Sequence, residues 1–190
     1  MMTLAAASEN NWWIPLVGVV IGGLITIISN FAATWWTDRL KRATERQQLA
    51  GAICGELKGI LSLVEHRKIA SILRRSCEVS LGTRKLQYLS FSIRQNYFEV
   101  FEKNVHRIGC LPPSVAADVS GVYVFMKGAA EDLKTMEEGS PLAWDFDLGY
   151  MFLAGALQTI EIVEAKGRAL IPKLEREASR TIWQELEGSI

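Results

Sequence analysis

A long stretch without any charged residue constrains the fold of this chain more than any other feature. Residues 10–37, between Glu9 and Asp38, are 28 consecutive uncharged residues, most of them apolar. As a helix, the stretch from Trp13 to Trp35 would rise roughly 33 Å at about 1.5 Å per residue, which matches a hydrocarbon core of about 30 Å. Tryptophan favours the two interfaces of a bilayer. A pair of tryptophans stands at each end of the stretch, and we predict that all four are interfacial anchors: Trp12, Trp13, Trp35 and Trp36. We therefore predict a transmembrane helix over residues 12–36.

The charged residues on either side of this stretch predict its orientation. One acid and no base precede it, whereas Arg39, Lys41 and Arg42 follow it closely. Because basic flanks stay in the cytoplasm, residues 1–11 are predicted outside the cell and the rest of the chain inside. A cleaved signal peptide would have a basic start and a shorter apolar core, and a buried core helix would rarely carry tryptophan pairs at both ends. We favour an anchor over both alternatives.

One face of the predicted membrane helix carries only small and polar residues. Gly18, Gly22, Thr26, Asn30 and Thr34 recur every four residues, so they share a face. Two glycines at this spacing let membrane helices approach closely, and an asparagine in hydrocarbon needs a hydrogen-bond partner. We predict that this face makes helix–helix contacts in a homo-oligomer. In a larger ring it could line a narrow polar path, and in a monomeric anchor Asn30 would be wetted near the inner interface.

The remainder of the chain predicts an all-α domain in the cytoplasm. Glycine and proline are absent from residues 24–50, so the membrane helix is expected to continue through a polar juxtamembrane stalk, residues 37–48. Residues 49–190 carry apolar residues at helical spacing and are predicted to form an antiparallel helical bundle. Residues 83–95 could hold a short extended piece, and Pro172 should kink or split the last helix. The expected helices cover about residues 49–80, 96–105, 113–138 and 148–186.

A second glycine pattern lies beyond the stalk. Gly51, Gly55 and Gly59 are again four residues apart on one predicted helix face. Each interior glycine costs roughly 1 kcal/mol of helix propensity relative to alanine. Three in register indicate a second close helix contact, either within the bundle or between subunits. The alternative is a marginal helix that bends at this point.

Few residue patterns in this chain suggest chemistry. Asp145 and Asp147 are two residues apart, as in some metal sites, but they fit a helix cap better, with Asp147 as the expected cap. The basic residues at 66–68 and 74–75 could form a lipid or anion surface. The three cysteines form no CxxC pair, no nucleotide or catalytic motif occurs, and the formal charge is zero. We therefore expect no catalytic residues, no cofactor, no metal and no nucleic-acid partner.

A short motif in residues 97–113 supports a resemblance. Asn104, Ile108, Gly109 and Leu111 form the pattern Asn-x-x-x-Ile-Gly-x-Leu, and Tyr123 follows twelve residues later. With the glycine-rich anchor and the long charged helix, the layout resembles a broad group of uncharacterised small bacterial single-pass inner-membrane proteins, over roughly residues 12–130. The resemblance implies a bacterial inner (cytoplasmic) membrane and supplies no activity. It implies turn and cap roles for Asn104 and Gly109.

These patterns lead to two main hypotheses about function. The first is a non-enzymatic membrane protein that self-associates through its transmembrane and cytoplasmic helices, as an effector or channel-like assembly in bacterial stress or phage defence. Its partners would be the lipid bilayer and further copies of itself. The alternative is a membrane-tethered adaptor or sensor whose helical domain docks a cytosolic protein partner or senses a ligand. An enzyme that uses an unrecognised site is a third hypothesis.

Overall fold

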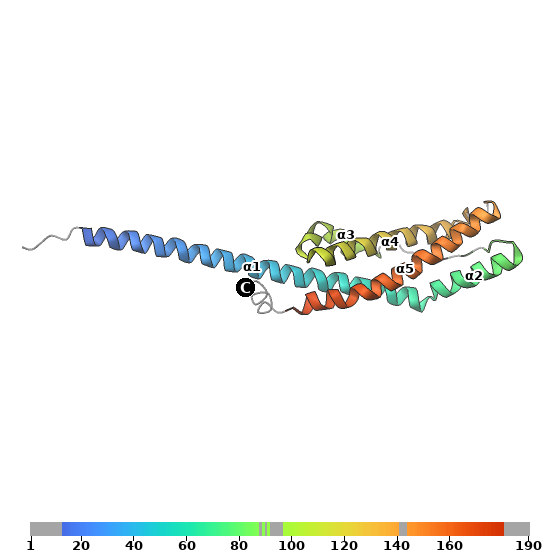
Figure 1. Ribbon diagram of the computed structural model, residues 1–190, viewed down its shortest axis with the longest axis horizontal. Coiled ribbons are helices and arrows are strands. Elements are labelled where there is room, and N and C mark those ends of the chain that lie inside the picture. The colour runs from blue at the N-terminus through green and yellow to red at the C-terminus, as the bar shows by residue number, and fades with distance from the viewer. Residues whose placement is uncertain (1–12, 88, 90, 92–96, 141–143, 181–190) are drawn as a thin grey trace, which may run out of the picture. The chain divides into compact units, whose positions relative to one another are not determined.

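The computed structural model describes residues 13–87, 89, 91, 97–140 and 144–180, with side chains described from Val17 onward. All regular structure in these residues is helical (Figure 1). The all-α prediction is therefore confirmed, and the described part of residues 83–95 holds no strand. The elements are the helices α1 (Trp13–His66), α2 (Ile69–Thr83), α3 (Glu99–Asn104), α4 (Pro113–Glu137) and α5 (Phe146–Ser179), and the 3-10 helix η1 (Val105–Cys110).

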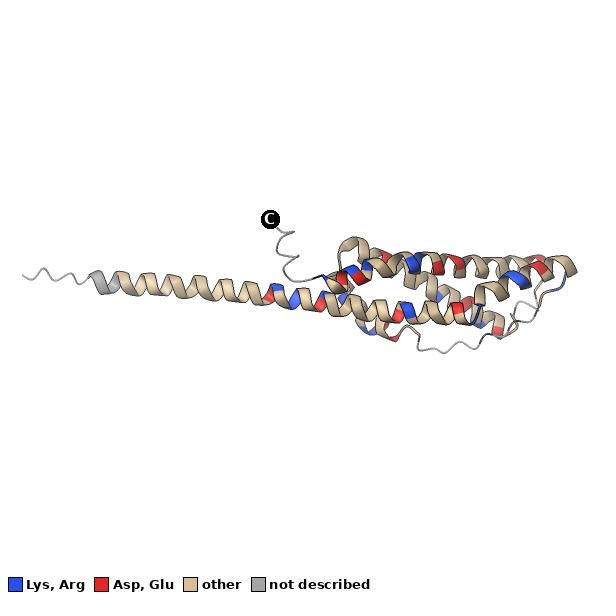
Figure 2. Cartoon of the chain, turned by 90° about the horizontal axis from the view of Figure 1, so that it is seen from below, with Lys and Arg blue, Asp and Glu red and all other residues tan. Residues whose placement is uncertain are grey.

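The chain divides into two compact units, Met1–Arg42 and Ala43–Ile190. Helix α1 contributes to both, and the boundary falls inside the predicted juxtamembrane stalk. In the first unit every described side chain from residue 17 to residue 39 is exposed, including Val19 at 75% and Phe31 at 77%. Figure 2 shows that the described helix carries no charged residue before Asp38. This unit therefore presents a continuous apolar helical surface.

The predicted single helix over residues 49–80 is wrong, because the chain breaks between α1 and α2. Lys68 adopts the left-handed conformation with φ 54° and ψ 36°. The amide of Lys68 donates to the carbonyl of Glu65 at 3.0 Å, which closes the last turn of α1. A left-handed lysine lacks the sequence signal that a glycine would give, since Cβ makes this conformation unfavourable by about 1 kcal/mol. The break was therefore not predictable from the residue types.

Helix α5 runs through Pro172 without dividing. The proline removes one backbone hydrogen bond, that from residue 172 to the carbonyl of Arg168. The flanking residues Leu170 and Leu174 are 2% and 0% exposed, so burial on both sides of the proline holds the helix together. The predicted alternative of a split is wrong. Residues 181–186, the expected end of this helix, lie outside the described residues.

In the second unit, α5 runs in the opposite direction to α1, α2 and α4. Lys58 of α1 pairs with Glu175 of α5 at 2.6 Å, and Glu65, further along α1, lies 3.8 Å from Arg168, earlier in α5. Opposite directions also follow from the pairs that join α2 and α4 to α5: Arg74 with Glu161, Arg84 with Asp147, Asp118 with Lys173, and Phe125 with Lys166.

The core of the second unit lies among α1, α2, α4 and α5. Burying a large aliphatic side chain fully stabilises a fold by about 1.5–3 kcal/mol. Such side chains, together with one tyrosine, come from all four helices, and the largest fully buried ones are Leu49, Ile53, Leu57, Leu73, Val119, Tyr123, Val163, Leu170 and Leu174.

Candidate functional site

The small and polar face of the membrane segment is open along its described length. A Cβ added to Gly18 or Gly22 would meet no atom within 4 Å. The hydroxyl of Thr26 donates to the carbonyl of Gly22 at 2.8 Å, and that of Thr34 donates to the carbonyl of Asn30 at 2.8 Å. Both threonines therefore satisfy their hydroxyl donors inside their own helix.

Asn30 differs from the threonines. Within the part of the chain that the structure describes, its side-chain carboxamide makes no hydrogen bond. It lies in a shallow, open groove along one side of the helix. The groove is lined by Ile27, Asn30, Phe31, Thr34, Trp35 and Asp38. Of the five predicted face residues, Asn30 is thus the one whose polar group most needs a partner from outside.

The predicted interfacial anchors can be followed at one end only. Trp12 lies outside the described residues, as does the side chain of Trp13. Trp35 and Trp36 are 51% and 42% exposed. The guanidinium carbon of Arg39 lies 4.1 Å from the centre of a Trp35 ring, a cation–π contact. An indole beside a basic residue suits the headgroup level of a bilayer.

The glycine face of the second unit lies on its surface. An added Cβ at Gly51 would lie 3.9 Å from the Cβ of Ala178, an ordinary contact, and one at Gly55 or Gly59 would meet nothing within 4 Å. All three glycines are exposed. Among the described residues, no helix approaches closely at Gly55 or Gly59, so a close contact there within the bundle is not seen, and contact between subunits and a marginal helix both stay open.

The closest approach of two helices at a glycine occurs elsewhere. A Cβ at Gly167 of α5 would lie 3.0 Å from Cδ1 and 3.3 Å from Cδ2 of Leu61 on α1. Gly167 is one of the buried residues of α5. In the sequence, nothing except its lack of a side chain set it apart from the apolar residues around it. The partner helix that makes this glycine necessary could not be read from the sequence.

The described residues contain one polar cluster that the sequence did not reveal. The half-buried carboxylate of Glu56 on α1 accepts hydrogen bonds from the amides of Val100 at 2.7 Å and Phe101 at 3.0 Å, in the first turn of α3. It also accepts one from the Tyr123 hydroxyl of α4 at 2.6 Å. We call Glu56, Val100, Phe101 and Tyr123 the Glu56 cluster. It joins three elements that are far apart in sequence.

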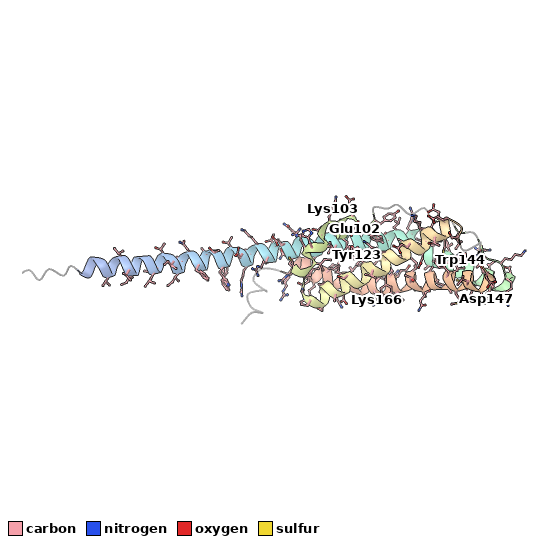
Figure 3. The ribbon with its side chains drawn as sticks, turned by 90° about the horizontal axis from the view of Figure 1, so that it is seen from above. Glu102, Lys103, Tyr123, Trp144, Asp147 and Lys166 are labelled. Carbon is pink, nitrogen blue, oxygen red and sulfur yellow. The ribbon has the colours of Figure 1, made fainter. Side chains whose placement is uncertain are left out.

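Aromatic contacts surround Tyr123 in this cluster. Its ring is 1% exposed and stacks on Phe101, with centroids 3.8 Å apart, while Phe98 meets it edge-on at 6.1 Å. Figure 3 shows Tyr123 near the helix that carries Glu102 and Lys103. Burial, followed by the hydrogen bond to Glu56, raises the pKa of Tyr123 far above its ordinary value. The phenol therefore keeps its proton well above neutral pH and donates it to the hydrogen bond with Glu56.

No residue type or spacing marked Glu56 as special. It stands next to the buried Leu57 but on the polar side of the predicted stripe, where an acid reads as solvated. Tyr97, Phe98 and Phe101 stand close together in the sequence, and Tyr123 follows the motif that ends at Leu111. Glu56 connects α3 with Tyr123 through hydrogen bonds to residues that lie 44 to 67 positions later in the sequence.

The other residues singled out in the sequence, Asp145, Asp147, Asn104 and Gly109, lie at helix ends or within η1. The cap of α5 is Asp145, whose carboxylate accepts a hydrogen bond from the amide of Asp147 at 3.3 Å, so the prediction of Asp147 as the cap is wrong by two residues. Asp147 pairs instead with Arg84. Asn104 ends α3, and its side-chain amide donates to the carbonyl of Val100 at 2.8 Å. Gly109 lies within η1.

Two described helices are long and apolar enough to cross a membrane, Val17–His66 and Phe146–Ser179. In the first, none of the most apolar 18-residue window is buried inside the structure, whereas in the second 28% of it is. Buried residues of α5 such as Leu153, Ile160 and Val163 belong to the core described above. Both helices qualify as membrane spans by length and composition alone. They differ in the share of their apolar surface that other helices bury.

No family model, curated protein or solved structure matches this chain.

Proposed function

We propose that this chain is a non-enzymatic single-pass membrane protein that self-associates through the face of α1 that contains Asn30. Residues 12–36 cross the bilayer, and the antiparallel helical bundle after them lies in the cytoplasm. The predicted setting, an effector of a bacterial inner membrane in stress or phage defence, is part of this proposal.

The Asn30 carboxamide is the observation that carries the proposal. Transfer of an amide from water to an apolar environment without a hydrogen bond costs roughly 2–7 kcal/mol. Thr26 and Thr34 avoid this cost by bonding to their own helix. Asn30 does not, and the same residue on a second copy offers both a donor and an acceptor. Interhelical bonds of this kind contribute about 1–2 kcal/mol in model peptides.

Close approach of two copies is compatible with the same face. The surfaces at Gly18 and Gly22 are unobstructed, so backbones could come together there without displacing a side chain. Both glycines lie two to three turns from Asn30 on the predicted face. Van der Waals contact at the glycines and a hydrogen bond at Asn30 would then act together.

A single span is favoured over two. The apolar window of α5 supplies core residues to the second unit, and α5 pairs through Glu161 and Glu175 with Arg74 and Lys58. Inserting α5 into a bilayer would remove these contacts and bury its charges in hydrocarbon. The corresponding window of α1 has no such packing.

Leucine substitutions at single positions test this proposal. Gly22→Leu and Asn30→Leu should each lower Förster transfer between two differently labelled copies in lipid vesicles, because one blocks approach and the other removes the hydrogen bond. Ala32→Leu is the matched control, since it also replaces a small residue by leucine but lies about 160° around the helix from Asn30. Transfer that stays at the wild-type level in Gly22→Leu and Asn30→Leu would refute self-association through this face.

A cavity in the second unit favours the sensor as a second candidate function. It has a volume of about 60 Å³, and apart from Arg67 its lining is apolar or aromatic, with Ile60, Phe98, Ala130 and Val163 among the residues. This cavity is partly open to solvent, and concave sites with a mainly apolar lining accept small apolar molecules. Benzene should therefore raise the melting temperature of the full chain in detergent, and Ala130→Leu should abolish the increase. No increase in the wild type would count against a ligand site.

A further inference from the structure

The segment of residues 97–110, which contains α3 and η1, buries little of its surface. Helix α3 has no buried residue, and in η1 only Ile108 is buried. By contrast, buried residues extend from Val115 to Met136 along α4. Elements with few buried contacts open at low free energy, independently of global unfolding. The segment is thus the part of the described bundle that packing holds least.

Polar contacts of the Glu56 cluster attach this segment to the bundle. The first amides of any helix have no partner within the helix. In α3, those of Val100 and Phe101 both donate to the Glu56 carboxylate of α1, one to each oxygen. Hydrogen bonds to a charged acceptor are stronger than neutral ones, at roughly 1.5–3 kcal/mol net.

Other contacts also attach this segment to the bundle. Glu102 of α3 pairs with Lys127 of α4 at 2.8 Å, but both side chains are about half exposed, and exposed pairs contribute little. The side chain of Arg46 donates to the carbonyl of Cys110 at 3.1 Å. The stack of Phe101 on Tyr123 keeps its geometry only while the backbone of α3 stays in place.

We propose that residues 97–110 open as one unit while α1, α2, α4 and α5 stay folded, and that the Glu56 carboxylate is the contact that keeps the unit closed. Opening exposes the ring of Tyr123 and removes one wall of the apolar cavity, since Tyr97 and Phe98 line it. The second unit thereby contains a conformational device. The proposal does not depend on how the membrane segment assembles.

Hydrogen exchange of the full chain in detergent, read by mass spectrometry of its peptides, tests the proposal. In Glu56→Gln the amide nitrogen of the new side chain cannot accept, so at least one α3 amide loses its partner. Peptides that cover residues 97–110 should exchange about tenfold to a hundredfold faster than in the wild type, while peptides of α4 and α5 keep their rates. Glu175→Gln, which breaks only the exposed pair with Lys58, is the matched control and should leave residues 97–110 unchanged.

Two outcomes would overturn the proposal. One is unchanged exchange of residues 97–110 in Glu56→Gln. The other is acceleration spread evenly over all helices, which would mean that Glu56 supports the whole fold. If Glu56→Gln does not fold, Tyr123→Phe replaces it, because that change removes one bond to Glu56 and keeps the ring. It should accelerate exchange severalfold, again in residues 97–110 alone. A uniform acceleration over all helices, or none in residues 97–110, would likewise overturn the proposal.

Two natural cysteines provide a second readout. Cys110 lies at the end of the segment, and Cys77 is buried in α2. Alkylation of Cys110 should be faster in Glu56→Gln than in the wild type, while alkylation of Cys77 should not change. Equal acceleration at both thiols would again indicate general loosening and contradict a separate opening unit.

Discussion

The Tyr123 hydroxyl shows how one buried donor can make stability depend on pH. Its pKa is raised in the folded chain, by burial and then by Glu56, above an unfolded value near 10. The folded state therefore keeps a proton that the unfolded state releases at high pH. A raised pKa contributes stability that is fully present below about pH 10 and is lost as the pH rises further.

Replacing Tyr123 by phenylalanine should reduce this dependence. The unfolding free energy of the wild type should fall by about 1 kcal/mol more than that of Tyr123→Phe for each pH unit above 10, because one proton is worth about 1.4 kcal/mol per unit. Urea unfolding in detergent at pH 9, 10 and 11, followed by circular dichroism, measures the difference. Parallel pH profiles for the two proteins would show that Tyr123 is not the responsible group.

A second prediction at the residue scale concerns Gly167. Leucine at this position would overlap with Leu61 of α1, because even a Cβ there lies 3.0 Å from the Leu61 side chain. Overpacking of this kind typically costs about 1–3 kcal/mol. Gly155→Leu on the same helix meets open space and should be neutral or stabilising, since it replaces a poor helix former. Thermal melts of the two variants compare them, and equal melting temperatures would refute the close contact.

At the scale of elements, sequence periodicity predicted helices well and their breaks poorly. The helices expected over residues 113–138 and 148–186 correspond to α4 and to α5 as far as the structure describes it, because apolar residues repeat there with the helical period. The end of α1 at His66 was missed because neither glycine nor proline marks it. The Glu56 cluster was missed because it depends on how helices pack, and the exposed face at Gly55 and Gly59 was consistent with either of two predictions.

The left-handed Lys68 between α1 and α2 gives an element-scale prediction. Glycine adopts this conformation without strain, so Lys68→Gly should be neutral or stabilise by up to about 1 kcal/mol, despite the added freedom of the unfolded chain. Lys166→Gly in the interior of α5 should instead cost about 1 kcal/mol of helix propensity. Chemical unfolding of both variants tests this. A loss at Lys68→Gly as large as at Lys166→Gly would mean that residue 68 is helical in solution.

At the scale of the whole molecule, the two units have different proposed roles. In the described part of the first unit, most of the exposed surface is apolar and the Asn30 carboxamide makes no hydrogen bond, which suits the proposed contact with lipid and with a second span. The second unit has its own core and a segment held by the Glu56 carboxylate. The uncharged stretch was sufficient to predict the first task. Nothing in the residue pattern predicted the second.

Self-association of the membrane segment is the central claim, and cysteine cross-linking in native membranes tests it most directly. The natural cysteines are first replaced (Cys54→Ala, Cys77→Ala and Cys110→Ser). Thr26→Cys then places a thiol on the predicted face without touching Asn30, and Ile28→Cys places one about 160° around the helix at nearly the same depth.

We predict that oxidation converts Thr26→Cys into a disulfide-linked dimer on a non-reducing gel, whereas Ile28→Cys stays monomeric. Leucine at Asn30 in the Thr26→Cys background should remove most of the dimer. Equal cross-linking at the two positions, or none at either, would contradict a contact between copies of this chain through the face that contains Asn30.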